Sequence, residues 1–134
     1  MIFVASGTQD GRGLVEYLLK QNYKVMASVV TNYGKELLPK DENLIINDHK
    51  LDEEAMKNCL KENQIKVFVD ATHPYAVNVS KTAMQVCDEL NIPYIRYERE
   101  VTPIPAYNKL HLVKTYEEAS DLAMQLGENI FLTT

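Results

Sequence analysis

The sequence predicts an α/β protein built on a mainly parallel, doubly wound β-sheet with helices on both faces. Short β-rich runs alternate with segments of about 10–15 residues whose apolar side chains recur at helical spacing, which is typical of βαβ units. The run Val67–Val69 is apolar at every position, as expected for a strand that is covered on both faces. Connections between parallel strands are right-handed, so we expect a three-layer, Rossmann-like arrangement.

The first third of the chain contains two predicted strands and two predicted helices. Ile2–Ser6 is a short apolar run ended by a glycine, which predicts a buried strand. In Gly13–Gln21, leucine and valine recur at helical spacing and predict an amphipathic helix. Lys24–Val30 is rich in β-forming residues and predicts a second strand. Tyr33–Leu38 predicts a short helix, because a proline follows directly and stops it.

The middle of the chain repeats this alternation. Leu44–Ile46 predicts a third strand, and Asp52 is a good N-cap for a helix that extends to about Asn63. Lys66–Asp70 predicts a fourth strand that is apolar at its centre. In Ala76–Leu90, apolar side chains return at helical spacing and predict the next helix.

The last third contains weaker signals. Pro93–Tyr97 predicts a fifth strand, and Thr102–Asn108, which holds two prolines, predicts a loop. Leu110–Val113 and Ile130–Thr133 are short apolar runs that we expect to be strands. Between them, Glu117–Leu126 predicts a helix, because its apolar residues lie on one face.

Length, charge and cysteine content restrict the class of protein. At 134 residues the chain has the size of one domain, so we expect a single domain over residues 1–134. Its 14 basic and 19 acidic residues give a net charge of −5, which argues against a nucleic-acid-binding protein. We expect no membrane span and no signal peptide, and hence a cytoplasmic protein, because no apolar run approaches ~18 residues and the N-terminus lacks a basic region. Cys59 and Cys87 have neither disulfide-framework nor metal-site spacing, so we expect no metal.

Glycines follow the first predicted strand, where doubly wound folds bind their ligands. Gly7, Gly11 and Gly13 are not spaced as in the G-x-G-x-x-G fingerprint, but small residues allow the backbone to approach a phosphate. The following helix would present free N–H groups, and Arg12 would add a charge-assisted contact. The alternative is a plain tight turn.

Polar and basic residues follow the second predicted strand. An acidic residue near this point often binds the ribose 2′-hydroxyl in NAD-selective sites. The sequence has no acid between Lys24 and Lys35, and Thr31, Asn32 and Lys35 suit a 2′-phosphate instead. A surface turn leading into a short helix is equally consistent with each residue alone.

The segment after the fourth predicted strand is the most unusual in the chain. Asp70–Ala76 places a carboxylate, a hydroxyl, an imidazole and a phenol within six positions. Pro74 fixes the turn and keeps His73 out of helical conformation. We therefore interpret it as a pre-organised polar cluster in the ligand-binding region. The alternative is that Asp70 or Thr72 only satisfies backbone N–H groups of a turn.

Two arginines follow the fifth predicted strand. Arg96 and Arg99 suit an anionic ligand that carries several carboxylates. The alternative is ion pairing with the neighbouring Glu98 and Glu100.

These segments resemble one family. Asp70–Ala76 is similar to the D-A-T-H-P-[FY]-A signature of the precorrin-6A reductases of cobalamin biosynthesis. Gly7–Arg12, Thr31–Gly34, Arg96–Arg99 and Ile130–Thr134 resemble further motifs of that family in the same order. Ser6 differs, since many members have glycine there. Because members are about twice as long, the resemblance implies the N-terminal half of a two-domain reductase, in which residues 129–134 lead into the second half.

The resemblance implies reduction of a double bond of precorrin-6A, or of its cobalt form, to precorrin-6B by NADPH or NADH. The substrate is a tetrapyrrole with several carboxylate arms. The implied cofactor-binding residues are Gly7, Thr8, Asp10, Gly11, Arg12, Thr31, Lys35 and Thr72. His73 and Tyr75 are implied as catalytic residues and, with Arg96 and Arg99, as substrate-binding residues. We expect the 134-residue chain by itself to be inactive.

Two other interpretations stay open. The same glycine turn would suit a non-catalytic, nucleotide-sensing module, which has no need for the polar residues around His73. A structural domain is the second alternative, since an unpaired last strand invites strand exchange or a homodimer.

Overall fold

The computed structural model describes residues 1–98 and 103–132. The chain divides into two compact units, Met1–Glu100 and Val101–Thr134. The sequence predicts one domain over the whole chain, whereas the described sheet and the helices that cover it belong to the first unit. Each unit is considered separately below.

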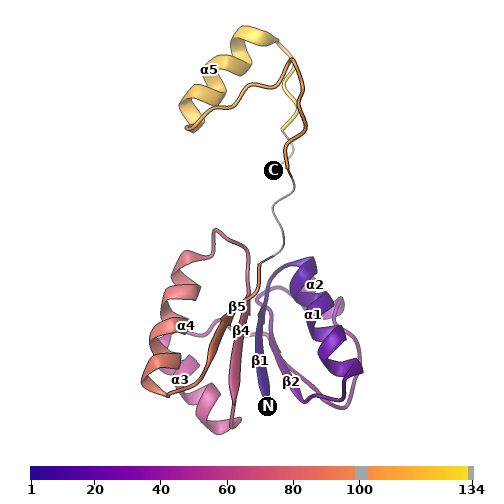
Figure 1. Ribbon diagram of the computed structural model, residues 1–134, viewed down its shortest axis with the longest axis vertical. Coiled ribbons are helices and arrows are strands. Elements are labelled where there is room, and N and C mark those ends of the chain that lie inside the picture. Colours follow the sequence, from indigo (N-terminus) through magenta and orange to yellow (C-terminus); the bar gives the residue numbers. More distant parts are fainter. Residues whose placement is uncertain (99–102, 133–134) are drawn as a thin grey trace. The chain divides into compact units, whose positions relative to one another are not determined.

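The first unit contains a five-stranded sheet in which each neighbouring pair of strands is parallel. Its order is β3-β2-β1-β4-β5, so β1 and β4 lie side by side at the centre (Figure 1). The strands are β1 (Ile2–Ser6), β2 (Val25–Ser28), β3 (Leu44–Asn47), β4 (Val67–Ala71) and β5 (Tyr94–Arg96). All five carboxyl ends therefore lie along one edge of the sheet.

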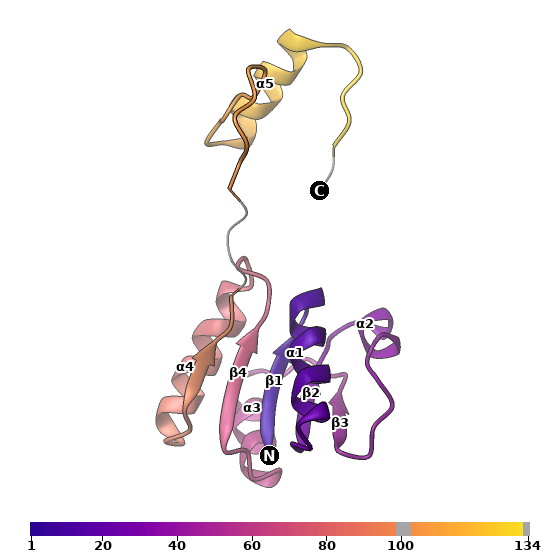
Figure 2. The ribbon, with the colours of Figure 1, turned by 45° about the vertical axis from the view of Figure 1, so that its right-hand side comes forward.

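Helices cover the sheet on both sides and complete three layers (Figures 1 and 2). They are α1 (Gln9–Lys20), α2 (Asn32–Glu36), α3 (Glu53–Glu62) and α4 (Val77–Glu89). Side chains alternate between the faces along each strand. Phe3 packs with residues of α3 and α4, whereas its neighbour Val4 packs with residues of α1. This arrangement confirms the predicted α/β, doubly wound, parallel sheet.

The largest difference from the predicted elements is the start of α1. The sequence predicts a helix from Gly13, but α1 begins at Gln9. Thr8 is its N-cap, and the Thr8 side chain accepts a hydrogen bond from the Gly11 amide. This cap stabilises the first turn despite the low helix propensity of glycine. Gly11 and Gly13 therefore lie within the helix, and only Gly7 lies in the turn.

The second unit contains one described helix and no described strand. This helix, α5 (Tyr116–Leu126), begins after Thr115, which accepts a hydrogen bond from the Glu118 amide. Leu110–Val113, which was predicted to be a strand, is not one. The second predicted strand, Ile130–Thr133, is not formed over Ile130–Leu132 either, and Thr133 lies outside the described residues. A strand needs a hydrogen-bonding neighbour, and no described segment of this unit supplies one. The proposed homodimer through the last strand therefore gains no support from the described residues.

The second unit also lacks a core of its own among its described residues. None of the side chains of α5 is buried, although several of them are apolar. The described part of the chain contains no helix that is long and apolar enough to cross a membrane.

Candidate active site at the carboxyl ends of the strands

The centre of the sheet is a topological switch point. The chain leaves β1 toward β2 on one side and leaves β4 toward β5 on the other, which opens the position where doubly wound folds bind ligands. Thr8 connects the two strand ends there. Its Oγ1 donates a hydrogen bond to the Ala71 carbonyl at 3.2 Å and accepts one from the Gly11 amide at 3.1 Å. One side chain thus caps α1 and ties it to the end of β4.

Close packing joins α1 to the end of β1. A Cβ added at Gly11 would lie 2.8 Å from the Ser6 hydroxyl and 3.3 Å from Cβ of Ala71. Ser6 is buried, and its hydroxyl has no hydrogen-bond partner among the described residues. Glycine at position 11 is therefore required by the approach of the helix to the sheet. A Cβ added at Gly7 meets nothing within 4 Å, so that glycine leaves open space beside the backbone.

A pocket of about 250 Å³ lies between the ends of β1 and β2. Its lining residues come from the end of β1 and the turn after it, from α1, from the segment after β2 and from the start of α2. They are Ser6, Gly7, Arg12, Val29, Val30, Thr31, Tyr33 and Gly34. The Thr31 hydroxyl accepts a hydrogen bond from the Gly34 amide and so caps α2. The structure thus brings together three predicted cofactor-binding residues, Gly7, Arg12 and Thr31.

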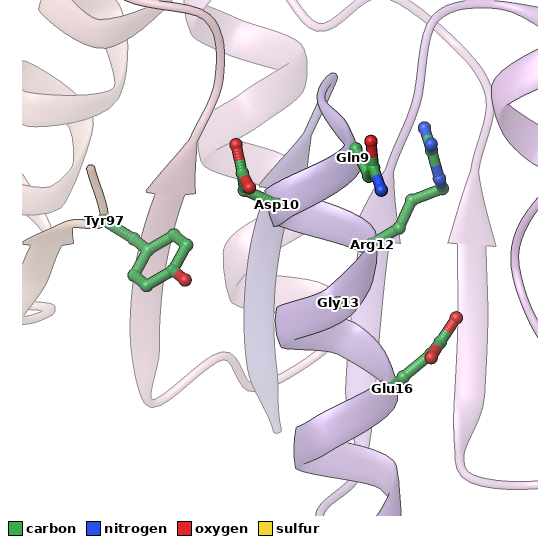
Figure 3. Close-up of a pocket in the computed structure, with 6 residues that line it drawn as sticks. All are labelled: Gln9, Asp10, Arg12, Gly13, Glu16 and Tyr97. Atoms are coloured by element: carbon green, nitrogen blue, oxygen red, sulfur yellow. The ribbon is translucent and has the colours of Figure 1, made fainter. Parts of the chain in front are cut away.

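A second, more open pocket of about 470 Å³ lies beside α1. Its lining residues, shown in Figure 3, are Gln9, Asp10, Arg12, Gly13, Glu16 and Tyr97. Arg12 lines both pockets, and in Figure 3 its side chain extends away from Tyr97. Among the described residues the Arg12 side chain makes no hydrogen bond or ion pair. Its guanidinium is therefore available to an anionic ligand.

Lys35, another predicted cofactor-binding residue, is already paired. Its ammonium lies 2.6 Å from Oδ2 of Asp48, which follows β3. The hydrogen bond from Lys35 and its positive charge lower the pKa of the Asp48 carboxyl. Lys35 is not among the residues that line the pocket containing Gly7 and Arg12. A ligand that uses Lys35 would have to compete with Asp48.

Asp70 is a fully buried carboxylate near the end of β4. Its Oδ1 accepts hydrogen bonds from the Thr72 amide at 2.9 Å and the Thr72 hydroxyl at 2.7 Å. Its Oδ2 accepts hydrogen bonds from Ser80 of α4 and Tyr94 of β5, both at 2.6 Å. Arg96 completes the set with Nη1 at 2.7 Å from Oδ1. A single carboxylate therefore joins β4, the turn after it, α4 and β5.

These contacts shift two pKa values in opposite directions. Burial raises the pKa of Asp70, but hydrogen bonds from Ser80, Tyr94 and Thr72 outweigh it and bring the pKa from 3.8 to about 2. Burial and the hydrogen bond to Asp70 raise the pKa of Tyr94 to about 12. At neutral pH the site therefore holds an anionic Asp70 and a protonated Tyr94 phenol.

The guanidinium of Arg96 is engaged on three sides. Besides Asp70, it donates from Nη1 to the Thr72 hydroxyl and from Nη2 to the Thr72 carbonyl, each at 3.1 Å. Its Nε donates to Glu98 at 3.0 Å. The structural alternatives given for the two segments are therefore both present. Asp70 accepts from a backbone amide of the turn, and Arg96 forms an ion pair with Glu98. Binding of substrate carboxylates by Arg96 stays a prediction.

The turn that follows β4 exposes His73 and Tyr75. Nδ1 of His73 accepts a hydrogen bond from the Tyr75 amide at 3.3 Å, and the two rings lie 4.9 Å apart. The Tyr75 side chain is 89% exposed, so it can contact a ligand without rearrangement of the fold. A backbone donor on Nδ1 leaves the proton of a neutral imidazole on Nε2.

Residues 1–134 match the model of one protein family, which is described as Precorrin-6x reductase CbiJ/CobK. The chain belongs to this family. The cobalt-precorrin-6A reductase of Priestia megaterium is 38% identical over 100% of the chain and 52% of that relative. The one from Methanococcus maripaludis is 35% identical over 97% of the chain and 52% of the relative. The chain therefore spans about half the length of these curated relatives.

A solved structure of a CobK precorrin-6A reductase has the same fold. It superposes with a TM-score of 0.64 at 22% identity, over 80% of this chain and 41% of that one. The resemblance recognised in the sequence is thus confirmed for the family and for the fold.

The site also contains three residues of this chain that the sequence patterns did not indicate. Ser80 and Tyr94 donate to Asp70, and Tyr97 lines the pocket beside α1. No sequence pattern marks Tyr94, in a short strand that also contains Arg96, or Ser80, among the polar residues of a helix. Of the predicted substrate-binding residues, Arg99 lies outside the described residues.

Proposed function

We propose that this chain is the cofactor-binding part of a reductase that reduces a double bond of precorrin-6A, or of its cobalt form, to precorrin-6B in cobalamin biosynthesis. Membership of the family supports the reaction class. The observation that carries the cofactor role is Arg12, an unpaired guanidinium beside Gly7 and Thr31 at the ends of β1 and β2. A bound nicotinamide cofactor supplies the hydride, and a proton completes the reduction.

The residues at the ends of β1 and β2 fit a nucleotide with phosphate groups. Gly7 leaves room beside the backbone, and α1 begins directly after Thr8 with its positive end toward this region. None of the described residues that line the pocket is acidic, and Arg12 contributes a positive charge. We therefore propose NADPH rather than NADH, with Arg12 as the residue that holds a phosphate.

His73 and Tyr75 are the residues that we propose to face the reacting ring system. Both are exposed at the switch point, next to Thr72. The imidazole, with Nδ1 as an acceptor, offers its Nε2 proton to a ligand or water. Asp70, buried and fully engaged, supports this turn and does not titrate near neutral pH.

We propose that catalysis by the whole protein also uses the part of its relatives that this chain does not span. The chain covers about 52% of the two curated relatives above. Turnover of precorrin-6A by the 134-residue chain alone would contradict this part of the proposal.

The cofactor role is tested by calorimetric titration of the chain with NADPH and with NADH. We expect binding of NADPH, and a loss of about tenfold or more in affinity for Arg12→Met, because a charge-assisted hydrogen bond is removed. Lys66→Met is the matched control, since it removes an exposed cation that precedes β4 at the opposite edge of the sheet. Absence of binding at millimolar NADPH and NADH would overturn the cofactor role of this chain, and equal losses in both variants would overturn the role of Arg12.

A further inference from the structure

The two oxygens of Asp70 face different parts of the molecule. Oδ2 accepts from Ser80 and Tyr94, which belong to regular elements of the core, α4 and β5. Oδ1 accepts from the amide and hydroxyl of Thr72 and pairs with Arg96. The carboxylate is therefore fixed to the fold through one oxygen and holds the turn after β4 through the other.

Arg96 holds the same turn independently. It lies at the end of β5, next to Asp70 in the parallel register of β4 and β5. Its Nη1 and Nη2 donate to the hydroxyl and the carbonyl of Thr72, both at 3.1 Å. These two contacts need the planar fork of a guanidinium, because a single ammonium cannot reproduce its geometry. Thr72 is thus held at its amide, hydroxyl and carbonyl by two charged side chains.

Fixing Thr72 fixes the residues that follow it. The turn continues through His73, whose carbonyl accepts from the Ala76 amide at 2.8 Å and whose Nδ1 accepts from the Tyr75 amide at 3.3 Å. The exposed side chain of Tyr75 makes a ring contact with His73, and no hydrogen bond from the side chain of Tyr75 is found among the described residues. The orientation of the imidazole therefore depends on the backbone conformation that Thr72 begins.

We propose that Arg96 is a positioning residue: with Asp70, it holds the Thr72–Tyr75 turn so that His73 keeps one tautomer and one orientation. The use of that imidazole in catalysis rests on the proposed function, whereas the positioning does not. This assigns Arg96 a role different from that of a substrate anchor, because its donors are directed at Asp70, Thr72 and Glu98.

The test is an NMR comparison of this chain with Arg96→Lys and with Tyr94→Phe, without any ligand. The ¹⁵N shifts of the His73 ring report the tautomer at about pH 8.5, where histidine side chains are neutral. Arg96→Lys keeps a positive charge beside Asp70 but loses the two-point contact with Thr72. We expect the separation of the two ring-nitrogen shifts to fall toward that of free histidine, and the His73–Tyr75 ring NOE to lose at least half its intensity.

Tyr94→Phe is the matched control, because it removes a donor from the other oxygen of Asp70. It lowers the stability of the same network but leaves the contacts of Arg96 in place, so we expect the His73 signals to stay unchanged. Unchanged His73 signals in Arg96→Lys would overturn the proposal and leave Arg96 as a counter-charge alone. Equal changes of the His73 shifts and NOE in both variants would also overturn the proposal, since the changes would then reflect destabilisation of the whole Asp70 network and not the loss of the Arg96 contacts. Because the NMR test uses no ligand, its outcome is independent of whether the chain binds NADPH, so this proposal and the proposed function can fail separately.

Discussion

Two parts of one sheet edge are built in opposite ways. At the ends of β1 and β2, Arg12 is unpaired among the described residues, and the buried Ser6 hydroxyl has no partner. At the ends of β4 and β5, Asp70 and Arg96 are joined to each other and to their neighbours by short hydrogen bonds. Both parts are polar, but in the described part of the chain the first leaves the Arg12 guanidinium and the Ser6 hydroxyl without a partner, whereas Asp70 and Arg96 at the second are both engaged.

The difference separates two uses of charge. Polar groups that are buried and satisfied fix a conformation, and each of them is costly to remove. A guanidinium without a protein partner contributes little to stability and is available to a ligand. This difference is the basis for proposing that the β1–β2 end binds the cofactor and that the β4–β5 end holds the turn that carries His73 and Tyr75.

The largest expected effect is that of Asp70→Asn at the satisfied end. The substitution removes the charge that pairs with Arg96 and places an NH₂ donor among side chains that already donate. We expect the free energy of unfolding to fall by about 3–5 kcal/mol, as for other broken buried ion pairs. Urea unfolding followed by circular dichroism measures it.

Asp48→Asn is the control for that experiment. Asp48 also pairs with a cation at the end of a strand, but both side chains of the Lys35–Asp48 pair are partly exposed. We expect a loss below about 1 kcal/mol. Similar losses in the two variants would show that the β4–β5 end is not specially stabilised.

The pH dependence of stability provides a second test of the β4–β5 end, with a smaller expected effect. Because the pKa of Asp70 is lowered from 3.8 to about 2, its contribution to stability is complete above pH 4 and is lost as the pH falls toward 2. We expect about 2 kcal/mol of the unfolding free energy to disappear over this range through Asp70. Urea unfolding between pH 5 and pH 2 measures the loss, and Asp70→Asn should lack this component. An equal loss in that variant would assign the acid sensitivity to other groups.

The smallest effect is expected at the open end, where Gly11 and Gly13 form a matched pair. Alanine at position 11 would meet Ser6 and Ala71, whereas alanine at position 13 meets nothing within 4 Å. We expect Gly11→Ala to lower the unfolding free energy by at least about 1 kcal/mol, through overpacking. Gly13→Ala should raise it by up to about 1 kcal/mol, because alanine favours a helix. Thermal unfolding of both variants checks the opposite signs, and two stabilised variants would contradict the close approach of α1 to β1.

Sequence patterns located most of the helices and strands, because residues that pack in the core must be apolar at regular spacings. The five strands of the sheet lie within about two residues of their predicted bounds, and Asp52 caps α3 as predicted. Both the apolar runs and the cap act locally, so they can be recognised one segment at a time. The predicted start of α1 at Gly13 was wrong, because the capping contact of Thr8 outweighs the low helix propensity of Gly11 and Gly13.

The predictions of strands outside the five-stranded sheet were wrong for a related reason. Leu110–Val113 is apolar enough for a strand, yet a strand depends on a neighbour that no local pattern specifies. In the described part of the second unit α5 was found as predicted, because a helix satisfies its backbone within its own segment. The loop predicted over Thr102–Asn108 also agrees, since its described residues, 103–108, have neither helix nor strand.

The sequence by itself determined the family, the alternation of strands and helices, and which residues follow each strand. Only the tertiary structure decided what those residues do to one another. Arg12 and Arg96 both looked like cations available to a ligand, but one is unpaired and the other holds Asp70 and Thr72. The physical reason is the strand order: the parallel pairing of β4 with β5 brings Arg96 beside Asp70, 26 positions earlier in the chain, and no local pattern encodes that contact.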